Sequence, residues 1–476
     1  MSENRWLTVI LGLYVALAFA YSWLMPPWEG PDEPAHYILA VNLARVGVFS
    51  NIEQNYEAGQ PQPYYWFASV PLRLLYQIDP EWVAVIQPER NYGNVRQPAP
   101  IFFWSDDNYQ FLPGLYLLRW LNILVGVGAL RLNYAAMRRF VRLKSQQHLQ
   151  SLPSRTDSKS SQTEALPSQA IALPSQTEEL PSQTEELPSP TVPLAALALI
   201  ALTPQFLHTT SSVANDTAGI LAGAILWWLL SRVVFKQVSS LELGLSVILA
   251  FLLPYTTKLT VLPVSIVLGM AALAYARQRW PGTWLRFAFG GVMIGSGVLL
   301  LGVWLIPEMG KLFLQQVAWR GFSFQEDAFE WAYLWEMVKQ VVWSYWGLVG
   351  WLQVGLAEWM VVLLTGLGIV GVIGAGMRNS GRESIEKRIH WVVWLVAGLA
   401  VLAVLKNGLN TINSQGRFLF PAVGALALLM MSGWENVLPV RFRGYLLPGI
   451  MVLMMGANLI LWFWGIIPVY YQPFWD

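Results

Sequence analysis

The stretch that decides the fold is RWLTVILGLYVALAFAYSWL (5–24) followed by MPPWEGPDEPAHY (25–37). The first part is a largely apolar run of about 20 residues, the length that an α-helix needs to cross the hydrocarbon core of a bilayer. The second part ends this helix with closely spaced prolines. It then places Asp32, Glu33 and His36 at the edge of the membrane, where ionisable groups are costly and usually functional.

The composition of the whole chain is that of a polytopic membrane protein. Of its 476 residues 55% are hydrophobic and only 12% are charged, against roughly 25% charged in soluble domains. The net charge of +1 gives no indication of nucleic-acid binding. The absence of cysteine excludes disulfides, iron–sulfur clusters and thiol catalysis. The N-terminal run lacks a small-residue cleavage site, so we interpret it as a retained first span.

Apolar runs of spanning length predict an all-α bundle of about 11 transmembrane helices. They lie at residues 5–24, 111–130, 192–207, 217–235, 241–257, 259–276, 285–306, 359–377, 389–405, 418–434 and 445–467. Lysine and arginine concentrate in alternate connections, whereas acidic residues outnumber basic ones in the 25–110 loop. The positive-inside rule therefore predicts a cytoplasmic N-terminus, with the 25–110 and 307–358 loops outside.

The chain divides into three parts. Residues 1–130 hold the first two spans and the outer loop 25–110, for which we predict short amphipathic helices and the catalytic groups. Residues 131–191 form a cytoplasmic linker with a seven-residue repeat of the type LPSQTEE. Its recurring proline and single leucine per repeat exclude a coiled coil, so we predict disorder. Residues 192–476 hold the remaining spans.

The Asp32–Glu33 pair allows two interpretations. The prolines predict a short helix around 34–45, and a carboxylate at its start could cap free N–H groups. Capping needs only one oxygen, whereas two carboxylates and His36 together indicate proton transfer or a cation. Asp106 and Asp107, in the same loop, are weaker candidates because a solvated loop needs no explanation for two acids.

Three other polar groups interrupt apolar runs, and the predicted topology puts all of them on the outer face. Asn215 and Asp216 open a span, as a helix cap would. Lys258 and Arg417 could snorkel to the headgroups, or they could bind a lipid phosphate. Gly416 beside Arg417 would let a bulky headgroup approach the backbone.

The order of these motifs resembles the GT-C superfamily of membrane glycosyltransferases, which includes the protein O-mannosyltransferases and the aminoarabinose transferases of lipid A. Five motifs also resemble a family of bacterial multi-pass membrane proteins grouped with GT-C. They are PDEPAH (31–36), QPQPYY (60–65), SSVAND (211–216), TKLT (257–260) and QGRFLFP (415–421). The resemblance covers nearly the whole chain apart from the repeat linker.

The resemblance implies transfer of a sugar from a polyprenyl-phosphate donor to a glycan, lipid or protein acceptor, with inversion, on the outer face of the bacterial plasma membrane. It implies that Asp32 is the general base. Lys258 and Arg417 would bind the donor phosphate, and Gln62, Tyr64 and Tyr65 would contact sugar or lipid. Glu33 is the second catalytic candidate beside Asp32. Candidates for orienting the acceptor or holding a divalent cation (Mg²⁺, Mn²⁺ or Ca²⁺) are His36, Asn215, Asp216, Asp106 and Asp107, and Glu33, His36 and Asp216 could also tune Asp32. The family more commonly has histidine where this chain has Gln62, so the specificity could differ.

Two other functions share some of these features. A transporter or flippase of a lipid-linked sugar would also need a cationic phosphate site and broken spans. It would not need a large acidic outer loop, and the two halves of the sequence show no inverted repeat. A non-catalytic subunit could keep the fold without the activity, although the intact Asp32–Glu33 pair argues against this.

Overall fold

The computed structural model describes residues 2–47, 60–84, 112–151, 191–305, 328–377, 384–410 and 414–471. Within this part of the chain the protein is helical apart from one small hairpin. The repeat of the 131–191 linker lies outside the described residues.

The predicted spans all coincide with helices. Helices long and apolar enough to cross a membrane are α1 (Glu3–Leu24), the first part of α4 (Pro113–Ser151), α7 (Asp216–Val234), α9 (Leu262–Arg279), α13 (Glu358–Met377), most of α14 (Ser384–Asn410), α15 (Val423–Val437) with the preceding turn η4 (Gly416–Ala422), and α17 (Leu446–Ile460) continued by η5 (Leu461–Ile466) and α18 (Ile467–Tyr471). The remaining predicted spans correspond to α5 (Thr191–Leu202) with α6 (Pro204–Thr210), α8 (Ser240–Thr256) and α10 (Trp284–Leu305). The all-α polytopic fold is thus confirmed.

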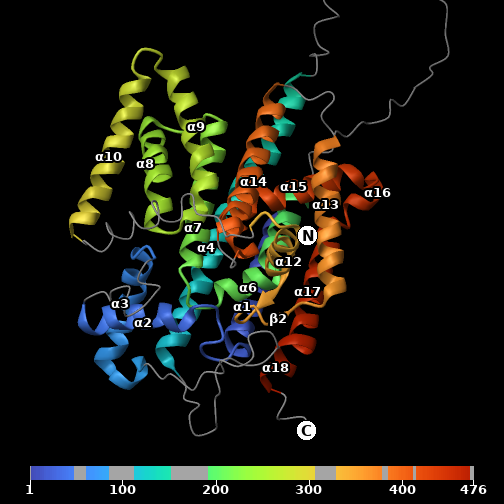
Figure 1. Cartoon of the computed structure of the whole chain (residues 1–476). Helices are drawn as coiled ribbons and strands as arrows, with labels where there is room; N and C mark the ends of the chain where they lie inside the picture. The colour runs from blue at the N-terminus through green and yellow to red at the C-terminus, as the bar shows by residue number, and fades with distance from the viewer. Residues whose placement is uncertain are drawn as a thin grey trace, which may run out of the picture.

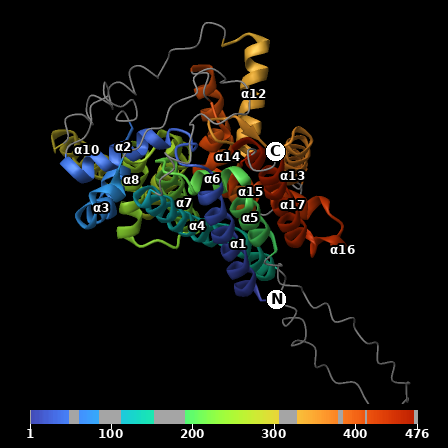
Figure 2. The ribbon, with the colours of Figure 1, turned by 90° about the horizontal axis from the view of Figure 1, so that it is seen from below.

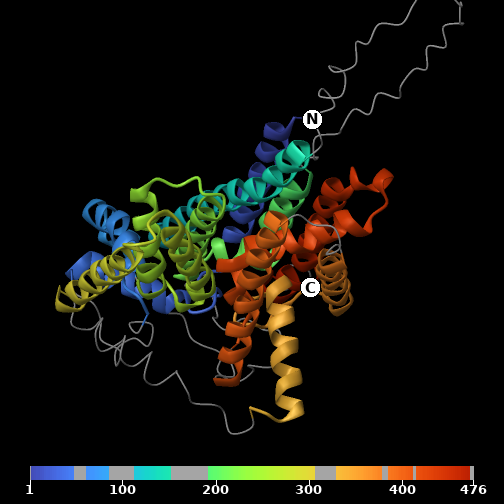
Figure 3. The ribbon, with the colours of Figure 1, turned by 90° about the horizontal axis from the view of Figure 1, so that it is seen from above.

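These helices form groups that keep their places in all three views. In Figure 1, α8, α9 and α10 lie together at the left, and α13 and α17 lie at the right, with α4 and α7 between. Figure 3 shows the same division from above. Helix α5 is buried from Val192 to Leu202, as an element that is apolar on every face should be.

Two structural details were not predicted from the sequence. The span at 192–207 is bent by 62° between α5 and α6, where Pro204 begins a new helix. The 307–358 loop contains an amphipathic helix, α12 (Trp331–Trp346), and an antiparallel hairpin of β1 (Leu348–Val349) and β2 (Val354–Gly355). Trp343 Nε1 donates to the Leu356 carbonyl and ties α12 to the end of this hairpin.

The 25–110 loop contains two helices among its described residues, α2 (Glu33–Val46) and α3 (Pro63–Ile78), followed by the short turn η2 (Pro80–Val83). They lie at the end of the bundle where α1 ends and α4 begins (Figure 1). The predicted helix around 34–45 is therefore confirmed. The charged residues of the candidate site lie at this end.

Candidate functional site

The turn between α1 and α2 has an unusual backbone. Trp28 and Asp32 both adopt left-handed conformations, with φ of 71° and 60°. Non-glycine residues rarely do so, and such positions cluster at functional sites. Asp32 occupies the N-cap position of α2, but its side chain makes no capping hydrogen bond. The capping interpretation of Asp32 is therefore wrong, and its carboxylate is directed elsewhere.

The Asp32 carboxylate faces a group of charges from three distant segments. Arg417 Nη2 lies 3.6 Å from Asp32 Oδ2, and Arg417 Nη1 lies 3.3 Å from Asp216 Oδ2. Lys258 Nζ donates to Asp216 Oδ1 at 2.5 Å. We call these four residues, Asp32, Asp216, Lys258 and Arg417, the Asp32 cluster.

The cluster is formed where several helices begin. Asp216 is the first residue of α7, Lys258 precedes the short turn η3 (Leu259–Val261), and Arg417 lies in η4. Asp216 and Arg417 are each only 6% exposed, whereas the Asp32 side chain is 29% exposed. The cluster is therefore buried on the Asp216 side and open at Asp32.

Glu33 has different surroundings although it follows Asp32 directly. Its side chain is fully buried, and Arg119 of α4 donates to both carboxylate oxygens, from Nε to Oε1 at 2.9 Å and from Nη2 to Oε2 at 2.6 Å. The backbone N–H groups of Trp28 and Val213 donate to the same oxygens. Such a bidentate, fully bonded carboxylate holds the turn in place, so Glu33 acts here as a structural partner of Arg119.

Arg119 also holds the end of the first span. Its Nη1 donates to the carbonyls of Ser22 and Met25, and its Nη2 to that of Pro26. The sequence analysis missed this residue. The signal was present, because Arg119 is a lone charge inside an apolar run and such a charge faces the protein interior.

His36 lies one turn into α2 and is 3% exposed. Its Nδ1 shares a hydrogen bond of 2.7 Å with the Tyr65 hydroxyl on α3. Burial lowers the pKa of the His36 imidazole to about 4, and the nearby charges of the Asp32 cluster act on it in both directions. His36 is therefore neutral at pH 7 and joins α3 to the edge of the cluster.

The predicted sugar contacts gather around the start of α3. Asn122 of α4 donates from Nδ2 to the Tyr64 hydroxyl at 3.1 Å and to the Ser212 carbonyl at 2.6 Å. Asn215 donates from Nδ2 to Gln60 Oε1 at 3.3 Å, so it does not cap α7 with its side chain. Gln62 is buried, and its Oε1 has no hydrogen-bond partner among the described residues.

The structure brings most of the predicted site together. Asp32, Asp216, Lys258 and Arg417 form one cluster, with His36 beside it. Asp106 and Asp107 lie outside the described residues. The prediction for Gly416 was wrong, because a Cβ there would approach the Val341 carbonyl oxygen of α12 to 2.3 Å. Gly416 thus allows close packing against α12 and leaves no room for a headgroup.

The cluster does not fit a divalent cation. No group of three or more His, Cys, Asp or Glu side chains suited to a metal occurs among the described residues. Asp216, the most buried acid of the cluster, already bonds two cationic side chains. A metal ion would have to displace them, so we derive no step through a metal.

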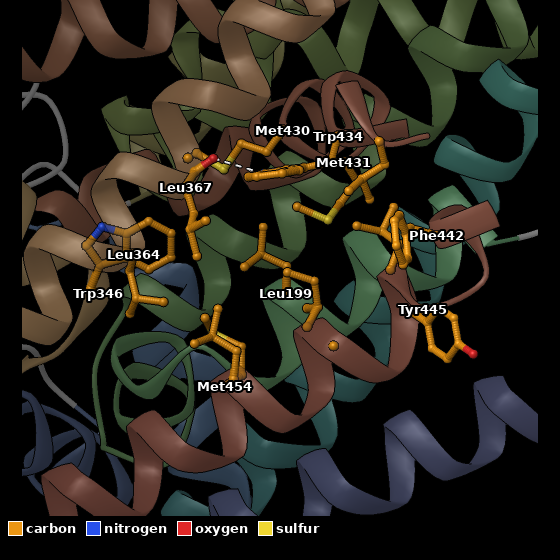
Figure 4. Close-up of a pocket in the computed structure, with 16 residues that line it drawn as sticks. Leu199, Trp346, Leu364, Leu367, Met430, Met431, Trp434, Phe442, Tyr445 and Met454 are labelled. Carbon is orange, nitrogen blue, oxygen red and sulfur yellow. Dashed lines mark hydrogen bonds between the residues drawn. The ribbon is translucent and has the colours of Figure 1, made fainter. Parts of the chain in front are cut away.

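A cavity of about 330 Å³ lies apart from this charged site. Figure 4 shows its lining, which includes Leu199, Trp346 and Met454. The lining indoles have hydrogen-bond partners: Trp434 Nε1 donates to the Leu367 carbonyl and Trp346 Nε1 to the Thr365 hydroxyl. No residue of the Asp32 cluster lines this cavity.

The sequence matches no protein-family model and none of the curated proteins. Two solved structures show a distant similarity, both of an oligosaccharyltransferase from Archaeoglobus fulgidus. The apo form has a TM-score of 0.42 at 12% identity, covering 97% of this chain and 56% of that one. The complex of AglB with an inhibitory peptide and a dolichol-phosphate has a TM-score of 0.44 at 11% identity, with the same coverage. The chain thus spans about half the length of these proteins, and a similarity of this size decides neither fold family nor function.

Proposed function

We propose that the protein is a GT-C type glycosyltransferase. It would transfer a sugar from a polyprenyl-phosphate donor to an acceptor hydroxyl, with inversion, on the non-cytoplasmic face of a bacterial plasma membrane. The observation that carries this proposal is the Asp32 cluster. It combines one partly exposed carboxylate with two cations held in place by a second, buried carboxylate.

The proposed reaction is a single displacement. The acceptor oxygen attacks the anomeric carbon while its proton passes to an oxygen of Asp32. The bond between that carbon and the phosphate oxygen breaks, and its electron pair remains on the lipid phosphate. Arg417 and Lys258 stabilise the charge that develops there. Attack from the side opposite the leaving group inverts the configuration of the sugar.

Asp216 is a positioning residue in this mechanism. It bonds Lys258 and Arg417 at once and keeps both cations together at the end of the bundle. Preorganised charges stabilise a transition state without the cost of rearrangement. Glu33 acts indirectly, because its ion pair with Arg119 fixes the turn that carries Asp32.

Three buried polar groups, in the Asp32 cluster and near the start of α3, favour a hydroxylated ligand. The buried Oε1 of Gln62, Oδ1 of Asn215 and Nε of Arg417 have no hydrogen-bond partner among the described residues. Buried polar atoms normally have partners. A sugar, whose hydroxyls both donate and accept, can satisfy this mixture of acceptors and a donor.

The orientation of the site is part of the proposal. Lysine and arginine in alternate connections favour a cytoplasmic N-terminus. Because α1 crosses the membrane once before Asp32, the cluster would then lie outside. The donor and a glycan, lipid or protein acceptor would meet there in the synthesis of an envelope glycan.

Mass spectrometry of the lipids that co-purify with the protein tests the donor site. We expect a polyprenyl-phosphate sugar with the wild type and its loss from a Lys258→Ala/Arg417→Ala variant. A Lys236→Ala/Arg277→Ala variant is the matched control, since it removes one lysine and one arginine that are exposed elsewhere. Equal amounts of the lipid in all three proteins, or bulk phospholipid alone, would contradict the proposal.

Asp32→Asn separates the enzyme from the other functions. Loss of a general base lowers the rate by about 10²–10⁴-fold, whereas binding of the lipid should persist because Lys258 and Arg417 remain. A transporter would keep its transport rate in this variant, and a non-catalytic subunit would show no turnover to lose.

A further inference from the structure

Helix α3 exposes a continuous apolar stripe. From Phe67 onward its members recur every three to four residues, and Trp66 lies beside Phe67. Each is between 39% and 68% exposed: Trp66, Phe67, Val70, Leu74, Ile78 and, in η2, Trp82. This spacing puts the side chains of α3 on one face of the helix. Monomeric soluble surfaces rarely expose so many large apolar side chains together.

The opposite face of α3 packs against the rest of the protein. Tyr65 and Leu72 are completely buried, and Tyr65 bonds His36. Arg73, at the edge of the stripe, donates to the carbonyls of Leu43 and Ala44 at the end of α2. These contacts fix the rotation of α3, so the apolar stripe faces away from the bundle.

Packing against α4 places the stripe level with the start of a candidate span. A Cβ on Gly114, in the first turn of α4, would meet Leu72 Cδ2 at 3.1 Å and the Trp82 carbonyl oxygen at 3.0 Å. Helix α3 and η2 therefore press directly on the residue where a candidate span begins. In Figures 2 and 3 helix α3 also lies at the periphery of the molecule.

Aromatic side chains also lie at the ends of the two candidate spans beside α3. Trp23 in the last turn of α1 is 42% exposed, and its ring stacks on that of Tyr116 in the first turn of α4, with centroids 4.8 Å apart. Tryptophans near the ends of spans are typical of the membrane–water interface. The stripe of α3 also has tryptophan at both ends, Trp66 and Trp82.

We propose that α3 is an interfacial helix whose apolar stripe lies in the membrane leaflet on the side of the Asp32 cluster. Amphipathic helices bury such a face at the boundary between headgroups and acyl chains. Helix α3 would then form a wall between the leaflet and the cluster, with lipid on one face and Tyr65 on the other. The inference does not depend on the glycosyltransferase proposal.

Spin-label accessibility in vesicles tests this placement. The chain has no cysteine, so single cysteines can be labelled without further changes. We choose Val70→Cys and Leu74→Cys on the stripe, with the full chain in vesicles of phosphatidylcholine and phosphatidylglycerol. Val362→Cys on α13, 66% exposed, is the reference for lipid, and Glu81→Cys, exposed on η2, is the reference for water.

Oxygen enters lipid and a polar nickel chelate stays in water, so the ratio of their collision rates reports the surroundings of each label. We expect the ratio at both stripe positions to approach that at Val362 and to exceed that at Glu81. A ratio equal to that at Glu81 would show that the stripe faces water. Protection from both reagents would show that another protein covers it. Either result overturns the proposal, and neither affects the function of the Asp32 cluster.

Discussion

Asp32 and Glu33 are neighbours in the chain, yet they belong to two charged regions of opposite character. The Glu33–Arg119 pair is closed, because both side chains are at most 1% exposed and both carboxylate oxygens are bonded by protein groups. The Asp32 cluster is open at Asp32, which is 29% exposed and whose Oδ2 lies 3.6 Å from Arg417 Nη2.

The difference follows from the geometry of one turn. The left-handed conformation of Asp32 turns its carboxylate away from the helix N-terminus. Glu33, as the first residue of α2, instead faces α4 and the backbone of the turn. A sequence that reads as a pair of acids thus contains one structural and one accessible carboxylate, and the closed pair holds the open one in position.

The largest expected effect comes from breaking the closed pair. Arg119→Met leaves Glu33 buried without its counter-ion, which costs about 3–5 kcal/mol of unfolding free energy. Unfolding in mixed detergent micelles measures this loss. Glu33→Leu added to Arg119→Met should restore part of the stability, because the buried charge is then gone. If Arg119→Met unfolds with the wild-type free energy, the Glu33–Arg119 pair does not stabilise this turn.

The open cluster should respond less to the loss of one cation. Lys258→Met removes a charged hydrogen bond, which costs about 1.5–3 kcal/mol, but Asp216 keeps Arg417 as a partner. The same unfolding measurement applies, with Arg119→Met as the reference. If Lys258→Met destabilises the protein as much as Arg119→Met does, the contrast between the two regions fails.

The sequence predicted the open cluster better than the closed pair. Asp216, Lys258 and Arg417 each interrupt an apolar run at the end of a span. The order of the spans along the sequence is therefore enough to place all three on one face of the membrane. Arg119 lies within a span, and its pairing with Glu33 depends on how α4 packs against the first turn. The β1–β2 hairpin was not predicted either, because its strands of two residues each are too short to show an alternating pattern.

The pH dependence of stability tests the burial of His36 beside the open cluster. Burial lowers the pKa of His36 to about 4 in the folded protein, against about 6.5 in the unfolded chain. The unfolded state binds the proton first, so stability is lost as pH falls from about 6.5 towards about 4. This amounts to about 2 kcal/mol between about pH 7 and about pH 5. A His36→Asn variant should lack this loss, and an identical pH profile for both proteins would contradict it.

The smallest effect is expected at the outer edge of the cluster. Tyr65→Phe removes the hydrogen bond to His36 Nδ1, which costs about 0.5–1.5 kcal/mol. Tyr64→Phe is the matched control, because its hydroxyl bonds Asn122, which keeps the Ser212 carbonyl as a second partner. Since His36 lies beside the Asp32 cluster and not beside the closed pair, NMR titration of ring-labelled histidine should detect a shift of its pKa in Tyr65→Phe. The Tyr64→Phe titration should match that of the wild type. A shift in both variants would mean that α3 moves as a whole and that the pKa of His36 responds to the packing of α2 against α3. A shift in Tyr65→Phe alone would make this hydrogen bond the specific link between α3 and the open carboxylate.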